Sequence, residues 1–457
     1  MNLNRLFKPQ TMAVVGVSLG NDSNLANVVY NKNRLRYPVK VFGVNGRGGI
    51  LRGETVYKKV QDIPEKMDIV IIATKAEIVP SIVSDCIEAD AGGAVIVAGG
   101  FAETGGTELQ DKIVSIAKKS DFPIIGPNCL GIFSPDRMDT FFIPGERLVI
   151  PDKGRVAMVS QSGGILVDHM LKSSAEGVGL SLAVSIGNKA MIREMDMLQY
   201  FRDDPDTDVI TFYLEGFDEN EGRDFVLAAV ECGKPVIVLK SGKTLAGTTA
   251  VKSHTASMTG DYEVFSSVMM QYGIVEAKDE HEMVAFAEAL TCYKRSIQGR
   301  IAIITGSGGH GALATDACFA HGLSVPTLNR SVQEELYGLV SSNIRDIASF
   351  TNPIDLTGSA VDDDFMAVVR SISKVDDTEI DCIIALLLPY LPRITMDLGA
   401  QLSLLYQHEG KPIVAYVPHV DKYAMLVEGF MLNKTPVADS IEDAIHMAEA
   451  MRRYKSC

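Results

Sequence analysis

Short apolar runs alternate with amphipathic or polar stretches along most of the chain, as expected for strands separated by helices. The predicted strands of the first series are Met12–Val15, Val39–Asn45 and Met67–Thr74, followed by runs within Ala91–Gly105 and Phe122–Gly131. Because strands joined by helices pair in parallel, we expect a doubly wound parallel sheet that binds its ligands at the carboxyl ends of the strands.

The same alternation begins twice more. The second series has predicted strands within 155–164, 179–188, 208–217 and 235–240, and the third has them near 300–305, 324–329, 352–358, 382–390 and 412–418, with a helix at 441–456. Residues 131–153 interrupt the pattern and are predicted to form an interdomain linker that contains a hairpin. We therefore expect an α/β protein with three domains, at residues 1–130, 154–296 and 297–457.

Composition narrows the functional classes. The formal net charge of −15 opposes nucleic-acid or anionic-membrane binding as a main task. The seven cysteines show no metal-ligand spacing and are interpreted as free thiols in a reducing compartment. Since no apolar run has the length of a membrane span, we expect a cytoplasmic protein, with no metal site predicted in this chain.

Three glycine-rich turns each follow a predicted strand and open a helix, where unpaired backbone N–H groups form an anion site. Their candidate phosphate or ligand contacts are Gly16 and Ser18 in the first, Ser162, Gly163 and Gly164 in the second, and Gly308 and Gly309 in the third. The third turn lacks the lysine of a P-loop. His310 beside it is either a ligand contact or a polar residue at a helix start.

The first turn departs from the dinucleotide-binding pattern. Residues 16–20 do not supply GxGxxG, and the second strand ends in Asn45, Gly46 and Arg47 where a carboxylate would bind the ribose of NAD. An arginine better suits a phosphate. The sequence therefore favours a phosphorylated ligand and opposes a nicotinamide oxidoreductase.

His254 stands in a stretch of small and hydroxylated residues, Lys240–Asp261, which we expect to be a long functional loop. A solvated histidine without a role is the alternative. Glu215 ends another predicted strand, and its alternative is a capping or solvated carboxylate. The strand-order rule brings Ser160–Gly164, Glu215 and the His254 loop to one edge of a sheet, which favours a functional site.

Four motifs together resemble the α subunit of the NDP-forming acyl-CoA synthetases, specifically the ADP-forming acetyl-CoA synthetases, which are relatives of the succinyl-CoA synthetase α subunit. The motifs are GPNCLG at Gly126–Gly131, SQSGG at Ser160–Gly164, SHTASMTGD at Ser253–Asp261 and NPIDLTG at Asn352–Gly358. The resemblance covers nearly the whole chain. It implies a Rossmann-like CoA-binding domain followed by two flavodoxin-like ligase domains. The chain departs from the family's VNP-type turn at Asn45-Gly46-Arg47.

The resemblance implies that acyl-CoA and phosphate give acyl phosphate and CoA, that His254 becomes a phosphohistidine, and that the phosphoryl group passes to ADP. Glu215 would orient the imidazole, as a carboxylate does in a catalytic triad. The CoA contacts would be Gly16, Ser18, Asn45, Arg47, Ala98, Gly99, Gly100 and Asn128. ADP and Mg²⁺ would bind a separate β subunit with an ATP-grasp domain, as an α2β2 heterotetramer. A non-catalytic CoA-binding or CoA-sensing protein of the same fold is the alternative.

Overall fold

The computed structural model describes residues 2–218, 220–254, 261–418 and 420–455, and it divides into two compact units, Met1–Glu280 and His281–Cys457. Unit 1 carries two seven-stranded sheets, and unit 2 carries a five-stranded sheet. Most strands pair in parallel and are joined by helices, so the predicted fold class of three α/β sheets is confirmed. In the described part of the chain, every helix is too short or too polar to cross a membrane.

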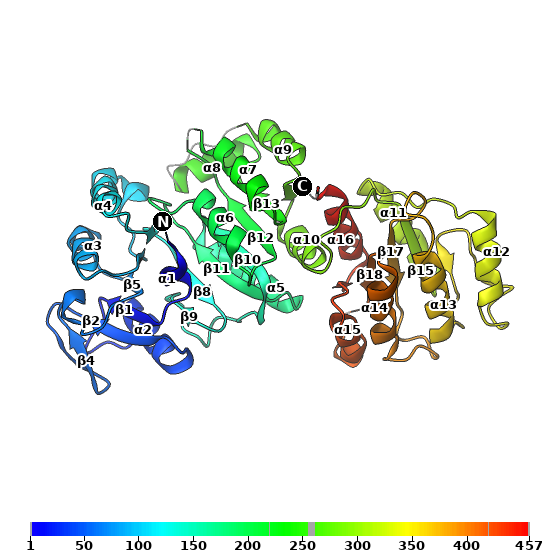
Figure 1. The fold of residues 1–457 in the computed structure, drawn as a ribbon, viewed down its shortest axis with the longest axis horizontal. Coiled ribbons are helices and arrows are strands. Elements are labelled where there is room, and N and C mark those ends of the chain that lie inside the picture. The colour runs from blue at the N-terminus through cyan, green and yellow to red at the C-terminus, as the bar shows by residue number, and fades with distance from the viewer. Residues whose placement is uncertain (1, 219, 255–260, 419, 456–457) are drawn as a thin grey trace. The chain divides into compact units, whose positions relative to one another are not determined.

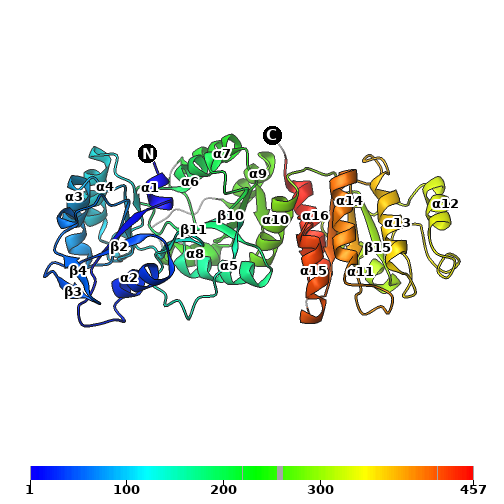
Figure 2. The same ribbon diagram turned by 60° about the horizontal axis from the view of Figure 1, so that its bottom comes forward.

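The first sheet has the order β3-β4-β2-β1-β5-β6-β7, and only β3 and β4 pair antiparallel. Its strands are β1 Thr11–Val15, β2 Lys40–Val44, β3 Gly49–Leu51, β4 Glu54–Tyr57, β5 Ile69–Ile72, β6 Ala94–Ile96 and β7 Ile124–Ile125, with helices α1 Asn4–Phe7, α2 Leu25–Arg36, α3 Val79–Glu88 and α4 Thr107–Lys119. Figures 1 and 2 show α2 on one face and α3 and α4 on the other. Alternate residues of β1 fill the two cores, Met12 and Val14 with α2, and Ala13 and Val15 with α3 and α4.

The second sheet has the order β14-β13-β12-β10-β11-β8-β9. Its strands are β8 Gly131–Ser134, β9 Met138–Asp139, β10 Lys153–Ser160, β11 Leu180–Ser185, β12 Val209–Leu214, β13 Val236–Lys240 and β14 Val275–Ala277, with helices α5 Gly163–Ala175, α6 Glu194–Asp203, α7 Glu221–Cys232, α8 Leu245–His254 and α9 Tyr262–Gln271. The hairpin expected in residues 131–153 is β8–β9. It pairs antiparallel with β11 and so extends this sheet.

The third sheet, in unit 2, has the order β16-β15-β17-β18-β19 and is parallel throughout. Its strands are β15 Ile301–Thr305, β16 Ile354–Asp355, β17 Cys382–Leu386, β18 Ile413–Tyr416 and β19 Val437–Ala438, with helices α10 Glu280–Cys292, α11 Gly308–Ala320, α12 Arg330–Leu339, α13 Asp362–Ser373, α14 Leu398–Glu409, α15 Ala424–Met431 and α16 Ile441–Arg453. Short 3-10 turns occur at Val60–Asp62, Ala76–Ile78, Ala102–Thr104 and Asp421–Tyr423.

Two local predictions were wrong. Most of the expected loop before His254 is helix α8, because Thr244 caps its start: the Thr244 hydroxyl accepts a hydrogen bond from the Gly247 N–H at 3.1 Å. Residues 324–329 make only a single bridge, between Ser324 and Arg300. Pro326 within that run lacks the N–H that a ladder needs.

A buried ion pair connects the first sheet's helix α2 with the β8–β9 hairpin. The Lys32 ammonium lies 2.8 Å from an Asp139 carboxylate oxygen, and both side chains are almost fully buried. Lys32 also donates to the carbonyls of Phe141 and Ile143, at 2.7 and 2.9 Å. Burial lowers the pKa of Lys32 and raises that of Asp139, so each charge depends on its partner in this environment.

We predict that Asp139→Asn lowers the free energy of unfolding by about 3–5 kcal/mol, because it leaves the Lys32 charge buried without its counterion. Chemical denaturation measures the change. The control is Asp136→Asn on the same hairpin, which breaks an ion pair with Lys153 between two exposed side chains and should have a far smaller effect. Equal losses in the two variants would contradict the structural importance of the buried pair.

Candidate active site

The carboxyl ends of β10, β12 and β13 meet at one edge of the second sheet. Ser160 at the end of β10 pairs with Tyr213 of β12, and Leu214 pairs with Lys240 at the end of β13. The residues that follow these strands therefore lie side by side (Figure 1). The structure thus brings the Ser160–Gly164 turn and Glu215 to the same edge of unit 1.

The Ser160–Gly164 turn opens helix α5. Ser162 is the N-cap residue, and its hydroxyl accepts a hydrogen bond from the Ile165 N–H at 3.5 Å. A Cβ atom at Gly163 would lie 2.9 Å from that of Leu130, so the backbone approach there requires glycine. Gly164 has no neighbouring heavy atom within 4 Å of the corresponding position. The amino end of α5 is therefore packed on one side and open on the other, an arrangement that admits an anion.

Glu215 is buried, with an exposed fraction of 4%, and a carboxamide fixes the backbone around it. The Gln161 oxygen accepts from the N–H groups of Glu215 and Gly216, at 2.5 and 3.2 Å. The Gln161 amide in turn donates to the Gly216 carbonyl at 2.9 Å and to Glu194. Gln161 thereby links the turn after β10 to the turn after β12.

Lys240, at the end of β13, lies against the same turn. Its ammonium donates to the Glu215 carbonyl at 2.8 Å and to the Ser241 carbonyl. Burial lowers the pKa of Lys240 to about 8, and the charge of Glu215 opposes that shift. Sequence analysis missed this residue. The sequence does contain a signal for it: a lysine ends the apolar run of β13, the strand beside the one that precedes Glu215.

A buried charge cluster supports the turn from behind. The Lys189 ammonium lies 3.3 Å from Glu194, 3.1 Å from Glu221 and 3.2 Å from the Gly216 carbonyl. All three side chains are buried. Sequence reasoning missed this cluster because Glu221 comes from a segment separate from Lys189 and Glu194, and the three residues follow no known motif.

The structure does not show the remaining predicted catalytic and phosphate-binding residues at this edge. His254 is the last residue of α8, and its side chain and residues 255–260 lie outside the described residues. Gly308 and Gly309 open α11 in unit 2, after the N-cap residue Ser307. His310 is 3.1 Å from the Ser307 hydroxyl through Nδ1, as expected for a polar residue at a helix start.

The first sheet places Gly16 at the switch point between β2 and β5, which pair on opposite sides of β1. Gly16 has a φ of +105°, and a Cβ there would lie 2.3 Å from the Ala73 carbonyl oxygen. The Ser18 hydroxyl accepts from the Asn21 N–H at 3.1 Å. Thr74 follows β5, and its hydroxyl oxygen is buried without a hydrogen-bond partner among the described residues. Sequence analysis missed Thr74, although it stands at a strand end at the switch point.

Several residues predicted to contact CoA already form hydrogen bonds within the protein. The Asn45 amide donates to the Val17 carbonyl at 2.6 Å, and its oxygen accepts from the Arg47 N–H at 2.9 Å. A carboxylate oxygen of Glu103 accepts from the Gly100 N–H at 2.6 Å. Burial acts to raise the pKa of Glu103, but hydrogen bonds from Asn188 and from backbone N–H groups lower it overall.

Ala98, Gly99 and Asn128 lie close together. The Asn128 N–H donates to the Ala98 carbonyl at 2.9 Å, and a Cβ at Gly99 would lie 3.5 Å from the Asn128 side-chain oxygen. The Asn128 amide also donates to the Asn188 oxygen at 3.3 Å. These residues therefore form the side of the first sheet that meets the loop after β11.

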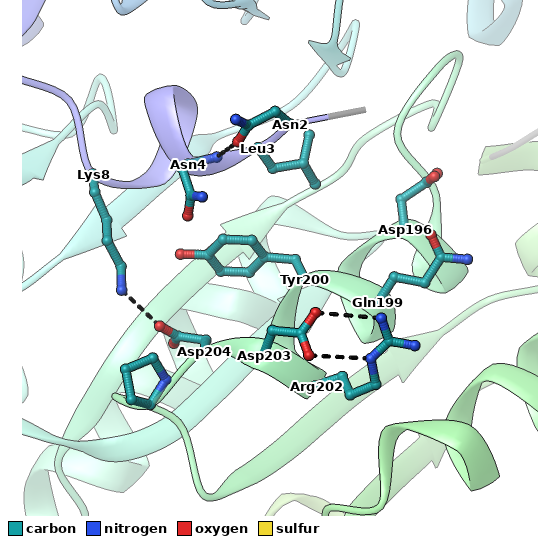
Figure 3. Close-up of a pocket in the computed structure, with 11 residues that line it drawn as sticks. Asn2, Leu3, Asn4, Lys8, Asp196, Gln199, Tyr200, Arg202, Asp203 and Asp204 are labelled. Carbon is teal, nitrogen blue, oxygen red and sulfur yellow. Dashed lines mark hydrogen bonds and ion pairs between the residues drawn. The ribbon is translucent and has the colours of Figure 1, made fainter.

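A cavity of about 410 Å³ lies at the opposite edge of the second sheet, between the amino-terminal turn and α6 (Figure 3). Its two basic side chains pair with acidic neighbours. Lys8 lies 2.7 Å from Asp204, and Arg202 lies 3.3 Å from Asp203. Because both basic side chains are paired and the cavity is distant in topology from Glu215, we assign this cavity no part in the reaction.

Comparison with known proteins identifies the family. Residues 10–135 match the family model described as a CoA binding domain, and residues 153–290 match the one described as a succinyl-CoA ligase like flavodoxin domain. The α subunit of acetate–CoA ligase [ADP-forming] II from Pyrococcus furiosus is 32% identical over 423 residues, which cover 90% of this chain and 89% of that subunit. The chain belongs to the ADP-forming acetate–CoA ligase family.

Other relatives and a solved structure are similar to the chain over most of its length. Acetate–CoA ligase [ADP-forming] I from Archaeoglobus fulgidus is 36% identical over 85% of this chain and 55% of its own length. The chain spans about half the length of that relative and of one from Methanocaldococcus jannaschii. The structure of dinucleotide forming acetyl-coenzyme A synthetase 1 from Candidatus Korarchaeum cryptofilum, in complex with phosphate and ADP, aligns with a TM-score of 0.86, 30% identity and coverage of 99% of this chain and 97% of that one.

The lowered pKa of Lys240 predicts that the free energy of unfolding depends on pH. Because the folded pKa of about 8 lies below the ordinary value of 10.5, the unfolded chain binds more protons between these pH values. The free energy of unfolding of the wild type, relative to Lys240→Met, should therefore rise as the pH increases from about 8 to about 10.5. Denaturant titrations across this range measure the difference.

The Glu215→Gln background is the control for this experiment. It removes the charge that raises the pKa of Lys240, so the rise should begin at a lower pH. A difference between wild type and Lys240→Met that stays constant across the range would contradict the assigned environment of Lys240.

Proposed function

We propose that the chain is the α part of an ADP-forming acyl-CoA synthetase, with acetyl-CoA as the expected substrate. The overall reaction converts acyl-CoA, phosphate and ADP to the free acid, CoA and ATP. One observation carries the proposal: the open amino end of α5 lies at the same sheet edge as Glu215. Membership of the ADP-forming acetate–CoA ligase family suggests which reaction this geometry would serve.

Three transfers account for all atoms of the proposed reaction. A phosphate oxygen attacks the thioester carbonyl, the C–S bond breaks, and CoA leaves as acyl phosphate forms. An imidazole nitrogen of His254 attacks phosphorus, and the P–O bond breaks to release the carboxylate. A β-phosphate oxygen of ADP then takes the phosphoryl group, which restores the imidazole and gives ATP.

The edge of the second sheet supports roles for its own residues. The N–H groups at Gly163 and Gly164 would hold the phosphate, because the helix dipole and unpaired donors favour an anion at this position. Glu215 would accept a hydrogen bond from one ring nitrogen of His254 and so direct the other nitrogen at phosphorus. Gln161 and Lys240 would act as positioning residues, since they hold the backbone of the Glu215 turn.

We assign CoA to the first sheet, at the switch point. Gly16, Ser18 and the Thr74 hydroxyl would face its phosphate groups, and Arg47 would supply a cation. Ala98, Gly99 and Asn128 would lie nearer the thiol end, toward α5. Asn45 and Gly100 would contribute through the shape of the loops, because their polar groups already bond within the protein.

The nucleotide step would use a second component. We propose a β subunit with an ATP-grasp domain that binds ADP and Mg²⁺, in an α2β2 assembly. Two relatives from Pyrococcus furiosus are named as α subunits, and the longer relatives have about twice the matched length, which supports a further part. The glycine-rich turns after β1, β10 and β15 also lack the lysine that a P-loop places on the nucleotide phosphates.

We predict that His254→Asn abolishes incorporation of labelled phosphate into the chain when acetyl-CoA and phosphate are supplied, and that CoA binding remains. The acid-lability of the label identifies phosphohistidine. The matched control is His408→Gln, which changes an exposed histidine on α14 and should leave labelling intact. Acid-labile phosphate in the His254 variant would contradict the assignment, and an unlabelled wild type would favour a CoA-binding protein without catalysis.

We predict that Glu215→Gln lowers the labelling rate by roughly 10²–10⁴-fold, because the neutral amide no longer stabilises the charged imidazole. Single-turnover labelling measures the rate, and thermal denaturation on the same samples tests whether the fold persists. A near-native rate in a folded variant would leave Glu215 with a structural role only.

A further inference from the structure

Four potential metal ligands converge in unit 2 from three helices. Glu282 lies in the first turn of α10, His321 directly follows α11, and His446 and Glu449 lie one turn apart on α16. One ligand atom from each lies within 4.8 Å of the others. Glu282, His446 and Glu449 are buried, and the His321 side chain is 11% exposed.

Each imidazole is held between an inner and an outer carboxylate. Nδ1 of His321 is 2.8 Å from an oxygen of Glu449, and Nε2 is 2.8 Å from Glu442. His446 repeats the pattern, with Nε2 3.9 Å from Glu282 and Nδ1 3.4 Å from Asp443. Metal-ligating histidines characteristically give one nitrogen to the ion and the other to a carboxylate. Glu442 and Asp443 occupy the positions of those outer carboxylates.

The charge balance also fits a divalent cation. The inner carboxylates are Glu282 and Glu449, and the imidazoles of His321 and His446 complete the set. Arg453 pairs with one oxygen of Glu449, while the other oxygen faces His321. Arg453 compensates part of this negative charge, and a dication would add to that compensation in a buried environment, where net charge is costly.

The distances require only small local changes. Tetrahedral zinc with ligands at about 2.0–2.2 Å places those ligands about 3.3 Å apart. Separations within 4.8 Å would shorten by at most about 1.5 Å, and the 2.8 Å between Nδ1 of His321 and Glu449 would lengthen by about 0.5 Å. Rotation of the glutamate side chains can supply both changes.

We propose that Glu282, His321, His446 and Glu449 form a structural zinc site in unit 2. Four protein ligands close the coordination sphere, as in structural rather than catalytic zinc sites. Two imidazoles favour Zn²⁺ over Mg²⁺, which prefers oxygen ligands and retains water. The ion would tie the first turn of α10 to α11 and α16. This site is separate from the proposed reaction.

The test uses the full-length chain, stripped with a chelator and titrated with ZnCl₂. We expect one equivalent of Zn²⁺ per chain to remain after gel filtration, with a higher melting temperature, whereas MgCl₂ at the same concentration gives neither. Co²⁺ in place of zinc should show the visible absorption of four-coordinate cobalt. A wild type that retains no stoichiometric zinc would overturn the proposal.

Variants locate the ion. His446→Gln and His321→Asn should each reduce zinc retention at least tenfold, and His408→Gln, which changes the exposed histidine on α14, should retain it fully. Glu282→Gln is nearly isosteric and serves if a histidine variant does not fold. Zinc retention unchanged in the folded ligand variants would overturn the site. These measurements of zinc binding do not depend on His254, so their outcome is independent of the proposed catalysis.

Discussion

The arrangement of unit 1 depends on a close backbone contact between the loops that follow β7 and β11. Gly187 has a φ of +54°, and a Cβ there would lie 2.4 Å from the Pro127 carbonyl oxygen and 2.5 Å from that of Asn128. The Asn188 N–H donates to Pro127 at 2.9 Å. Because glycine alone permits this approach, the two sheets are joined at their carboxyl edges. The contact places Asn128 of the first sheet near the start of α5.

The second constraint is electrostatic. Lys189 and Lys240 are buried at the candidate site, yet both are engaged within the protein, Lys189 by Glu194 and Glu221 and Lys240 by two carbonyls. These lysines therefore shape the Glu215 turn, and their ammonium groups already donate within the protein before any ligand arrives. In a chain of net charge −15, an incoming phosphate must then depend on backbone N–H groups. This explains why a glycine-rich helix start occupies the edge.

Hydrophobic periodicity and glycine-rich turns were sufficient to predict three α/β sheets and the helix starts near Gly163 and Gly308, because strand ends and glycine turns are local signals. It did not reveal α8, since a run of small and hydroxylated residues has weak periodicity and its start depends on the Thr244 cap. Nor could it reveal the Lys189 cluster. That cluster depends on contacts between segments that only the folded backbone brings together.

The first sheet shows how tertiary contacts can separate similar-looking turns. The turns after β1 and β6 both contain glycines at a strand end, and sequence analysis predicted CoA contacts in both, with phosphate at the first. In the structure, Glu103 already provides a carboxylate to the Gly100 N–H. A phosphate at the same place would meet a like charge. The turn at Gly16 and the buried Thr74 hydroxyl have no such internal anion among their hydrogen bonds in the described residues. This difference supports the proposed placement of the CoA phosphate groups at the β1 and β5 switch point, with the thiol end toward Asn128.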